Sequence, residues 1–319
     1  MKLLSVIIPS YNSEDYIDRC LSSLEVIKRK DIEFLIINDG STDSTEQIVN
    51  KFIKRDNRFK IFKKENGGYC SAINKGIGVA NGEYIMFLGS DDELIADAMN
   101  RVCVELNEKK PDLLYFGTLK VYDNGKEEQD PFTIYNDKFY SKTTLYDLHK
   151  ESGKKTSILF RRDTSRCYKR SLVGDLRYYG KTGISSDGCF AILVASKAKV
   201  FQFSSEICYK WHLRDDSLSA RKKNKTVLMD ELEVWDQFFE QIKILYPNKR
   251  VAKPIVYYIW SNLVAYKELK KLGIEKEKIE PHRKKMKNTF RWFSTSKYLL
   301  LRERIIMRFP FLFWFKIKK

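Results

Sequence analysis

Residues Gly82 to Glu93 read Gly-Glu-Tyr-Ile-Met-Phe-Leu-Gly-Ser-Asp-Asp-Glu, and they are the most informative residues about the fold. Its apolar run, Tyr84 to Leu88, is short, aromatic and bounded by glycine, which predicts a buried strand. Two adjacent carboxylates, Asp91 and Asp92, follow that strand closely. In an open α/β sheet, ligands bind beyond the carboxyl ends of the strands, where carboxylates can hold a divalent cation. An acidic helix N-cap is the alternative interpretation.

Upstream of this stretch, apolar runs alternate with helical patterns. Runs at Leu3–Ile8, Glu33–Ile37 and Phe59–Phe62 predict three more strands. Helical spacing between them predicts βαβ units and hence a parallel sheet, with polar loops converging on one rim. Neither a Gly-x-Gly-x-x-Gly sequence nor a P-loop follows the first strand, so the sequence supports neither a dinucleotide-binding fold nor a P-loop protein.

Composition limits the class of protein further. The chain has 319 residues, of which 43% are hydrophobic, so a sizeable core is expected. Its six cysteines are scattered without a Cys-x-x-Cys pair, which argues against a disulfide framework or a zinc site and predicts a cytoplasmic location. No apolar run approaches the roughly 20 residues that span a bilayer.

Four motifs in this order resemble those of family 2 glycosyltransferases. They are Ser-Val-Ile-Ile-Pro-Ser-Tyr-Asn (5–12), Ile-Ile-Asn-Asp-Gly-Ser-Thr-Asp-Ser-Thr (36–45), Glu-Asn-Gly-Gly (65–68) and Gly-Glu-Tyr-Ile-Met-Phe-Leu-Gly-Ser-Asp-Asp (82–92). The resemblance implies an α/β fold of the GT-A type, which is a Rossmann-like nucleotide-sugar-binding domain with a mainly parallel central sheet. It also implies a UDP-sugar donor and transfer with inversion at the anomeric carbon.

The same resemblance implies roles for single residues. Tyr11 would pack its ring on uracil, Asp39 would accept a hydrogen bond from the uracil N–H, and Lys75 would lie near the diphosphate or sugar. Taken singly, these residues have other interpretations: a surface aromatic, a helix N-cap and a solvated helix residue. The donor-binding residues that the resemblance implies are Pro9, Tyr11, Asp39, Asn66, Gly67, Lys75, Ser90, Asp91, Arg214 and Ser217.

Glycine at position 89 replaces the first aspartate of the family's Asp-x-Asp motif, whereas Asp91 matches the second, which contacts the metal. The resemblance therefore implies a divalent cation, Mn²⁺ or Mg²⁺, held by Asp91, Asp92 and His212. Because Gly89 supplies no ligand, water or diphosphate oxygens would fill more of the coordination shell, which both metals tolerate.

Two later segments supply the rest of the predicted site. Gly183–Phe190 resembles the family's Glu-Asp motif at a helix N-terminus, with Ser186 in place of the Glu and Asp187 retained. Inverting transfer needs a base for the acceptor hydroxyl proton, and Asp187 is the candidate; an N-cap aspartate is the alternative. Tyr209–Ser219 resembles the loop that closes over the donor, which implies that Arg214 contacts the diphosphate.

The last hundred residues carry most of the positive charge. Residues 221–319 hold 25 basic and 10 acidic residues, in a chain whose net charge is +17. The segment His282–Lys319 is basic and interleaved with aromatic residues, among them Phe290, Trp292 and Phe293. This pattern predicts an interfacial helix, with rings at the lipid headgroups and lysines on anionic lipid. Motifs of RNA-binding folds are absent, so no nucleic-acid partner is expected. A helical cap and a homo-oligomer interface stay open as alternatives.

The sequence thus predicts two domains. The catalytic domain covers 1–220, with a nucleotide-binding part over about 1–100 and an acceptor part over about 101–220, and a helical region covers 221–319. The predicted function is transfer of a sugar from a UDP-sugar to a hydroxyl of a glycan or lipid-linked acceptor. Its setting would be bacterial surface polysaccharide or glycoconjugate synthesis, at the inner face of the cell membrane. The alternative, which Gly89 and Ser186 favour, is a non-catalytic relative that binds a nucleotide sugar or glycan.

Overall fold

The structure is a computed structural model that describes residues 2–130, 137–152, 163–214, 224–246 and 265–297. The chain forms two compact units, and each is described by itself. Unit 1 comprises Met1–Thr143, Arg162–Gly183 and Lys197–Arg221, and unit 2 comprises Thr144–Arg161, Ile184–Ser196 and Lys222–Lys319.

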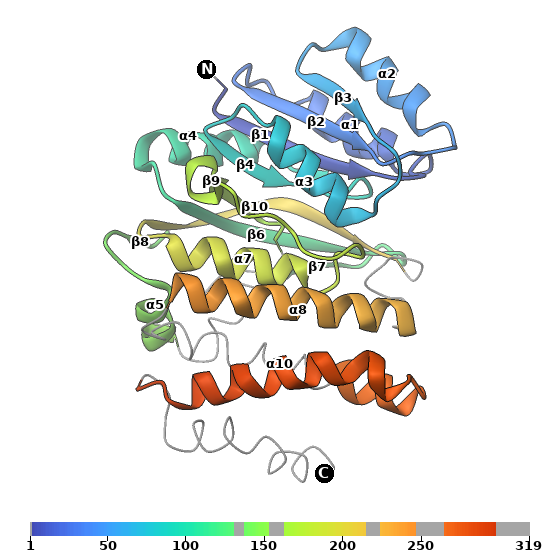
Figure 1. Cartoon of the computed structure of the whole chain (residues 1–319). Helices are drawn as coiled ribbons and strands as arrows, with labels where there is room; N and C mark the ends of the chain where they lie inside the picture. Colours follow the sequence, from blue (N-terminus) through green and yellow to red (C-terminus); the bar gives the residue numbers. More distant parts are fainter. Residues whose placement is uncertain (1, 131–136, 153–162, 215–223, 247–264, 298–319) are drawn as a thin grey trace. The chain divides into compact units, whose positions relative to one another are not determined.

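The N-terminal half of unit 1 is a parallel sheet, as the sequence predicts. Its strands lie in the order β3-β2-β1-β4, and each neighbouring pair is parallel (Figure 1). Every residue of β1 and β2 is buried, which is why both strands have continuous apolar runs rather than alternating patterns. The four strands are β1 Leu4–Ser10, β2 Ile32–Asn38, β3 Phe59–Lys63 and β4 Tyr84–Phe87.

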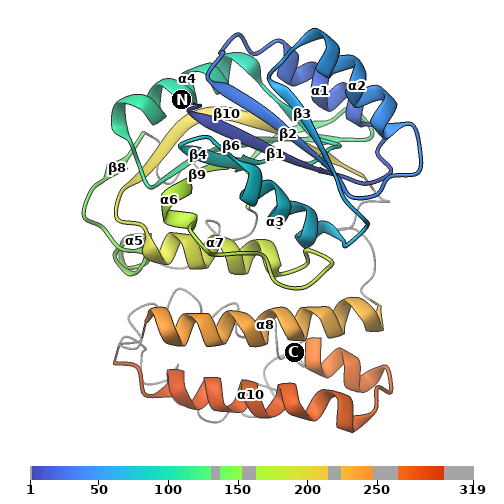
Figure 2. The ribbon, with the colours of Figure 1, turned by 45° about the horizontal axis from the view of Figure 1, so that its top comes forward.

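Helices cover both faces of this half-sheet (Figure 2). α1, α2 and α4 pack on the face that carries Val6 and Ile8, whereas α3 lies against Ile7 on the opposite face. Gly76 of α3 permits this close approach, because a Cβ at that position would lie 2.2 Å from Ile7 Cγ2. The helices are α1 Ile17–Glu25, α2 Thr45–Arg55, α3 Tyr69–Val79 and α4 Ala96–Lys109.

The part of the sheet beyond β4 contains antiparallel as well as parallel pairs. β9 runs antiparallel between β4 and β6, and β6 pairs in parallel with β10. The full order is β3-β2-β1-β4-β9-β6-β10-β5, so one mixed sheet runs through unit 1. The remaining elements of unit 1 are β5 Glu93–Leu94, β6 Leu113–Tyr122, β7 Glu127–Asp130, β8 Phe139–Tyr140, β9 Arg166–Lys169, α6 Arg170–Val173 and β10 Phe201–Leu213.

The described parts of unit 2 are helical, and α8 and α10 lie side by side (Figure 2). The rings of Phe239 in α8 and Phe293 in α10 are 6.5 Å apart between centroids. His282 Nδ1 lies 2.7 Å from Asp236 Oδ2 across the same pair of helices. The elements are α5 Leu145–Ser152, α7 Ser186–Lys197, α8 Lys225–Leu245 and α10 Lys276–Ser294.

The aromatic face of α10 packs on protein rather than facing outward. Phe290 and Phe293 are 1% and 0% exposed, because their rings pack inside unit 2. The prediction that these two rings lie at lipid headgroups is therefore wrong. The aromatic residues from position 298 on lie outside the described residues. Among the helices that the structure describes, none is both long and apolar enough to cross a bilayer.

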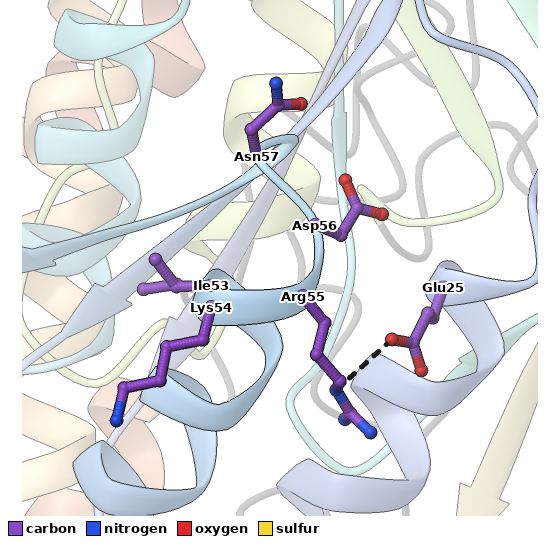
Figure 3. Close-up of a pocket in the computed structure, with 6 residues that line it drawn as sticks. All are labelled: Glu25, Ile53, Lys54, Arg55, Asp56 and Asn57. Atoms are coloured by element: carbon purple, nitrogen blue, oxygen red, sulfur yellow. Dashed lines mark ion pairs between the residues drawn. The ribbon is translucent and has the colours of Figure 1, made fainter.

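A pocket of about 500 Å³ opens at the C-terminal ends of α1 and α2 (Figure 3). An ion pair between Arg55 Nε and Glu25 Oε1, 3.4 Å apart, crosses it. In a βαβ unit, helix C-termini lie at the edge opposite the carboxyl ends of the strands, so this pocket is remote from the predicted donor site. Its lining residues are Glu25, Ile53, Lys54, Arg55, Asp56 and Asn57.

Gly76→Ala should lower the free energy of unfolding by about 1–3 kcal/mol, because the added methyl group would overlap Ile7. Gly78→Ala is the matched control in the same helix, since its Cβ would meet nothing within 4 Å. That control should raise stability by up to about 1 kcal/mol through helix propensity. Urea unfolding followed by circular dichroism measures both changes. Shifts of the same sign would contradict the packing of α3 on Ile7.

Candidate active site

The turn after β4 brings predicted residues to the carboxyl edge of the sheet. Asp92 N donates to Gly89 O at 3.1 Å, which closes the turn over 89–92. Ser90 Oγ lies 3.0 Å from Ser13 Oγ, so the turn is tied to the loop that follows β1. Since β1 and β4 are parallel neighbours, their C-terminal loops meet at the edge where open α/β sheets bind ligands.

Asp92 is buried and links this turn to β10 through hydrogen bonds. Its Oδ2 accepts a hydrogen bond from the Tyr209 hydroxyl at 2.5 Å, and its Oδ1 accepts one from His212 N at 2.9 Å. The Tyr209 oxygen in turn accepts from Gly89 N at 3.1 Å. Burial and the nearby charge of Asp91 raise the pKa of Asp92 to about 8. Both carboxylate oxygens are therefore engaged by donors from the protein.

Asp91 and Arg214, which come from distant segments, form an ion pair. Arg214 Nη2 donates to Asp91 Oδ2 at 2.5 Å. The Arg214 guanidinium lies 3.8 Å from the centroid of the Tyr16 ring, in a cation–π contact. Arg19 Nη2 donates to the backbone oxygen of Asp91 at 2.6 Å. Tyr16 and Arg19 were missed by the sequence reasoning, because no pattern at the start of α1 marks them as partners of this site.

The imidazole of His212 faces Glu93. Its Nε2 lies 2.7 Å from Glu93 Oε1, and Arg19 Nε lies 3.7 Å from the same oxygen. Two residues before His212, Lys210 lies opposite Glu93 in the antiparallel pairing of β10 with β5, and this pairing holds the two segments together. His212 thus joins the polar cluster through its backbone N–H and through its ring.

Asp39 organises the loop that follows β3. Its Oδ1 accepts from Gly67 N at 3.1 Å and from Lys64 Nζ at 2.5 Å, and its Oδ2 accepts from Gly68 N at 2.8 Å. Asp39 is only 3% exposed, and these hydrogen bonds compensate the cost of burying its carboxylate. Asp39 is not the N-cap of α2, which is Ser44. It fixes the Gly-Gly turn at the same edge of the sheet.

The other predicted donor-binding residues differ in exposure. Tyr11 is 51% exposed just after β1, so much of its side chain is open to solvent. Pro9 is buried inside β1. Asn66 is exposed in the Gly-Gly turn, and Lys75 is exposed on α3 with no ion pair to any residue that the structure describes. Ser217 lies outside the described residues.

Asp187 lies in the first turn of α7, within unit 2. Its Oδ1 accepts a hydrogen bond from Gly188 N at 2.7 Å. Ser185 donates its Oγ to Glu231 Oε1 at 2.7 Å, and Glu231 is a buried residue of α8. Glu231 was missed by the sequence reasoning, yet it brings a carboxylate to the start of the helix where Ser186 replaces the family's Glu.

The sequence predicts metal ligands at three positions, Asp91, Asp92 and His212. In the described part of the chain, no three His, Cys, Asp or Glu side chains are grouped so that they could hold a metal ion. Asp92 is engaged by Tyr209 and β10, and the His212 ring faces Glu93. Asp91 has a side chain that is 27% exposed, and its Oδ2 accepts the hydrogen bond from Arg214. The metal-binding roles of Asp91, Asp92 and His212 stay predictions.

A parallel half-sheet with a carboxylate, a guanidinium and an exposed tyrosine at its carboxyl edge defines an α/β protein with polar groups at the edge where such sheets bind ligands. The sequence profile of glycosyl transferase family 2 matches residues 5–177. The chain therefore belongs to this family of glycosyltransferases, as the four motifs predict.

Relatives in bacteria carry the same domain. Glycosyltransferase GlyA of Streptococcus pneumoniae is 29% identical over 221 residues, which are 68% of this chain and 31% of GlyA. Glycosyltransferase GlyG of the same species is 25% identical over 243 residues, 74% of this chain and 79% of GlyG. The minor teichoic acid biosynthesis protein GgaB of Bacillus subtilis is 28% identical over 224 residues, 69% of this chain and 24% of GgaB. The chain thus spans less than a third of the length of GlyA and GgaB.

A solved structure shares the fold. Residues 1–349 of S. aureus TarS, crystallised with UDP-GlcNAc, superpose with a TM-score of 0.72 at 20% identity. The match covers 98% of this chain and 88% of that structure. It confirms the predicted GT-A type of α/β fold, with additional helices at the C-terminus.

The buried Asp92 makes stability depend on pH. Its pKa of about 8 in the folded state exceeds the ordinary value of 3.8, so the folded state binds more protons between these values. The free energy of unfolding should fall as the pH rises from about 5 to about 8, by up to about 1.4 kcal/mol per pH unit. Asp92→Asn should remove this slope, whereas Asp18→Asn, an exposed control in α1, should keep it. Urea unfolding in EDTA measures the profiles, and parallel profiles for wild type and Asp92→Asn would contradict the assignment.

Proposed function

We propose that the chain is an inverting glycosyltransferase that moves a sugar from a UDP-sugar to a hydroxyl of a glycan or lipid-linked acceptor, in the synthesis of a surface polysaccharide or glycoconjugate. The observation that carries the proposal is the Asp91–Arg214 pair at the carboxyl edge of the parallel strands. A guanidinium suits a diphosphate, and the exposed Tyr11 ring suits a base. The UDP and UDP-GlcNAc complexes of TarS and the teichoic acid role of GgaB support the donor and the kind of product.

In the proposed reaction, Asp187 takes the proton of the acceptor hydroxyl. The acceptor oxygen then attacks the anomeric carbon while the bond to UDP breaks, and the electron pair leaves with the diphosphate. Arg214 stabilises the charge on the leaving diphosphate, and Asp91 would hold Mn²⁺ or Mg²⁺. The cation, when bound, supplies further neutralisation of that charge. The hydrogen bond between Ser185 and Glu231 fixes the start of the helix that carries Asp187.

Asp187→Asn should lower turnover about 10²–10⁴-fold, the usual contribution of a general base. The measurement is UDP release from a panel of UDP-sugars with Mn²⁺, and the thermal shift caused by UDP should persist in the variant. Asp97→Asn is the matched control, because Asp97 is the acidic residue in the first turn of α4. If both variants keep wild-type turnover, Asp187 is not the general base and only stabilises the N-terminus of its helix.

Tyr16 supports Arg214 and should therefore affect the donor. Tyr16→Leu removes the ring under the guanidinium and should raise the KM for the UDP-sugar about fivefold, whereas Tyr16→Phe should stay near wild type. The rate of UDP release at increasing UDP-sugar concentration measures both variants. Equal impairment of the two would mean that the Tyr16 hydroxyl, and not its ring, is what the site needs.

One observation favours the second candidate function, binding without turnover. A Cβ at Gly89 would lie 2.7 Å from Asp92 Oδ2 and 2.8 Å from Asp91 Oδ1. A third carboxylate therefore has no room here unless the other two move. Binding of a UDP-sugar with no UDP release on any acceptor would support a non-catalytic relative.

We further propose that the chain works peripherally at the inner face of the cell membrane through the region 221–319. The positive charge of that region supports the proposal, because anionic lipids attract clustered lysines and arginines. A lipid-linked acceptor would be presented at the same surface.

A further inference from the structure

α10 exposes a row of cations beside its buried face. Four basic side chains are exposed there, and this cation stripe consists of Lys276, Lys284, Lys287 and Arg291. At about 100° per residue the four positions fall within an arc of about 80°, and at about 1.5 Å per residue they extend over about 22 Å. The buried residues of α10 are Ile279, Met286, Thr289, Phe290, Phe293 and Ser294.

The stripe keeps an excess of positive charge, although Glu280 falls within its arc and Glu277 at its edge. Among the residues that the structure describes, none forms an ion pair with a member of the stripe, and other cations of unit 2 are paired. Glu280 is bound by Arg283 at 2.8 Å, and Glu277 lies in the first helical turn, where the helix dipole favours an acid. From residue 281 to the end of α10, every charged residue is basic. The paired cations are Lys243 with Glu240, Lys271 with Glu268 and Lys278 with Glu275.

The neighbouring helix exposes fewer unpaired cations. On α8, Glu233 and Glu240 are exposed, and Glu240 pairs with Lys243. Asp236 of α8 is buried against α10 beside His282 and Lys285. The exposed cations without an ion pair to a described residue therefore lie mainly on α10, which is the side that a negatively charged surface would attract.

We propose that the cation stripe docks the chain on a lipid bilayer that carries anionic phospholipid headgroups. This inference rests on the proposed function, which includes a membrane partner. It adds the residues that would contact the membrane. Because the four positions share one arc of about 80°, all four cations can approach a flat surface together. Because the apolar face of α10 is buried in unit 2, the contact is electrostatic and needs no insertion of this helix.

The sequence that follows α10 favours a bilayer over a soluble polyanion. Residues 298–319 combine basic residues with apolar and aromatic ones, a composition typical of segments that bind at lipid interfaces. A soluble phosphate polymer would use the charges alone. The aromatic residues of this segment include Phe309, Phe311, Phe313, Trp314 and Phe315.

The test is sedimentation of the full chain with lipid vesicles. Vesicles of phosphatidylcholine alone are compared with vesicles in which phosphatidylglycerol replaces about a third of that lipid. The stripe variant carries Lys284→Gln, Lys287→Gln and Arg291→Gln. The matched control carries Lys243→Gln, Lys271→Gln and Lys278→Gln, so that it loses the same charge from paired positions of unit 2.

The stripe variant should bind the anionic vesicles about 100-fold more weakly than wild type, and the control less than tenfold more weakly. Wild-type binding should weaken with added salt and be low on phosphatidylcholine alone. Equal losses in the two variants would overturn the proposal, as would unchanged vesicle binding by the stripe variant. Loss of inorganic polyphosphate binding with vesicle binding intact would assign the stripe to a polymer instead.

The thermal shift caused by UDP keeps the two proposals apart. Both variants should retain it, because the stripe lies in unit 2 and the predicted base- and diphosphate-binding residues lie in unit 1. A normal UDP shift without vesicle binding would refute the docking surface alone. Vesicle binding by a wild-type chain that neither binds UDP nor releases it from any UDP-sugar would refute the proposed function alone.

Discussion

The buried carboxylate of Asp92 accepts hydrogen bonds from two positions on β10, and the arrangement of the candidate site depends on this contact. The donors, Tyr209 and His212, lie 117 and 120 residues away along the chain. A carboxylate this deeply buried is tolerated only when it is hydrogen-bonded, so the turn after β4 and the end of β10 must stay together. That constraint places Asp91 within reach of Arg214.

Much of the parallel half-sheet could be predicted from the sequence because its strands are buried on both faces. Continuous apolar runs such as Val6–Ile8 and Phe34–Ile37 allow little else, and polar residues mark where each strand ends. The motif residues Asp39 and Asp91 could be placed at the carboxyl edge for the same reason. A local pattern sufficed, since each of these positions follows its own strand.

Partners supplied by distant segments could not be predicted in this way. Tyr16 meets Arg214, and Glu231 meets Ser185, through tertiary contacts that leave no periodic signal. α10 illustrates a related limit. Helical spacing of Phe290 and Phe293 identifies an apolar face, but the same spacing suits a face covered by lipid or by another helix. In the structure, Phe239 of α8 packs against Phe293, and most of the exposed residues of α10 are charged.

Gly89 and the two aspartates that follow it are best understood as one arrangement. Both carboxylates lie within 3 Å of the place where a Cβ at position 89 would be, so glycine gives them room. One of them, Asp92, is engaged by β10, and its raised pKa already reflects the charge of Asp91. A third carboxylate would add to this repulsion, whereas Arg214 offsets the charge of Asp91. The loss of the motif's first aspartate therefore lowers the negative charge at the site while Asp91 and Arg214, the two groups suited to a cation and a diphosphate, stay in place.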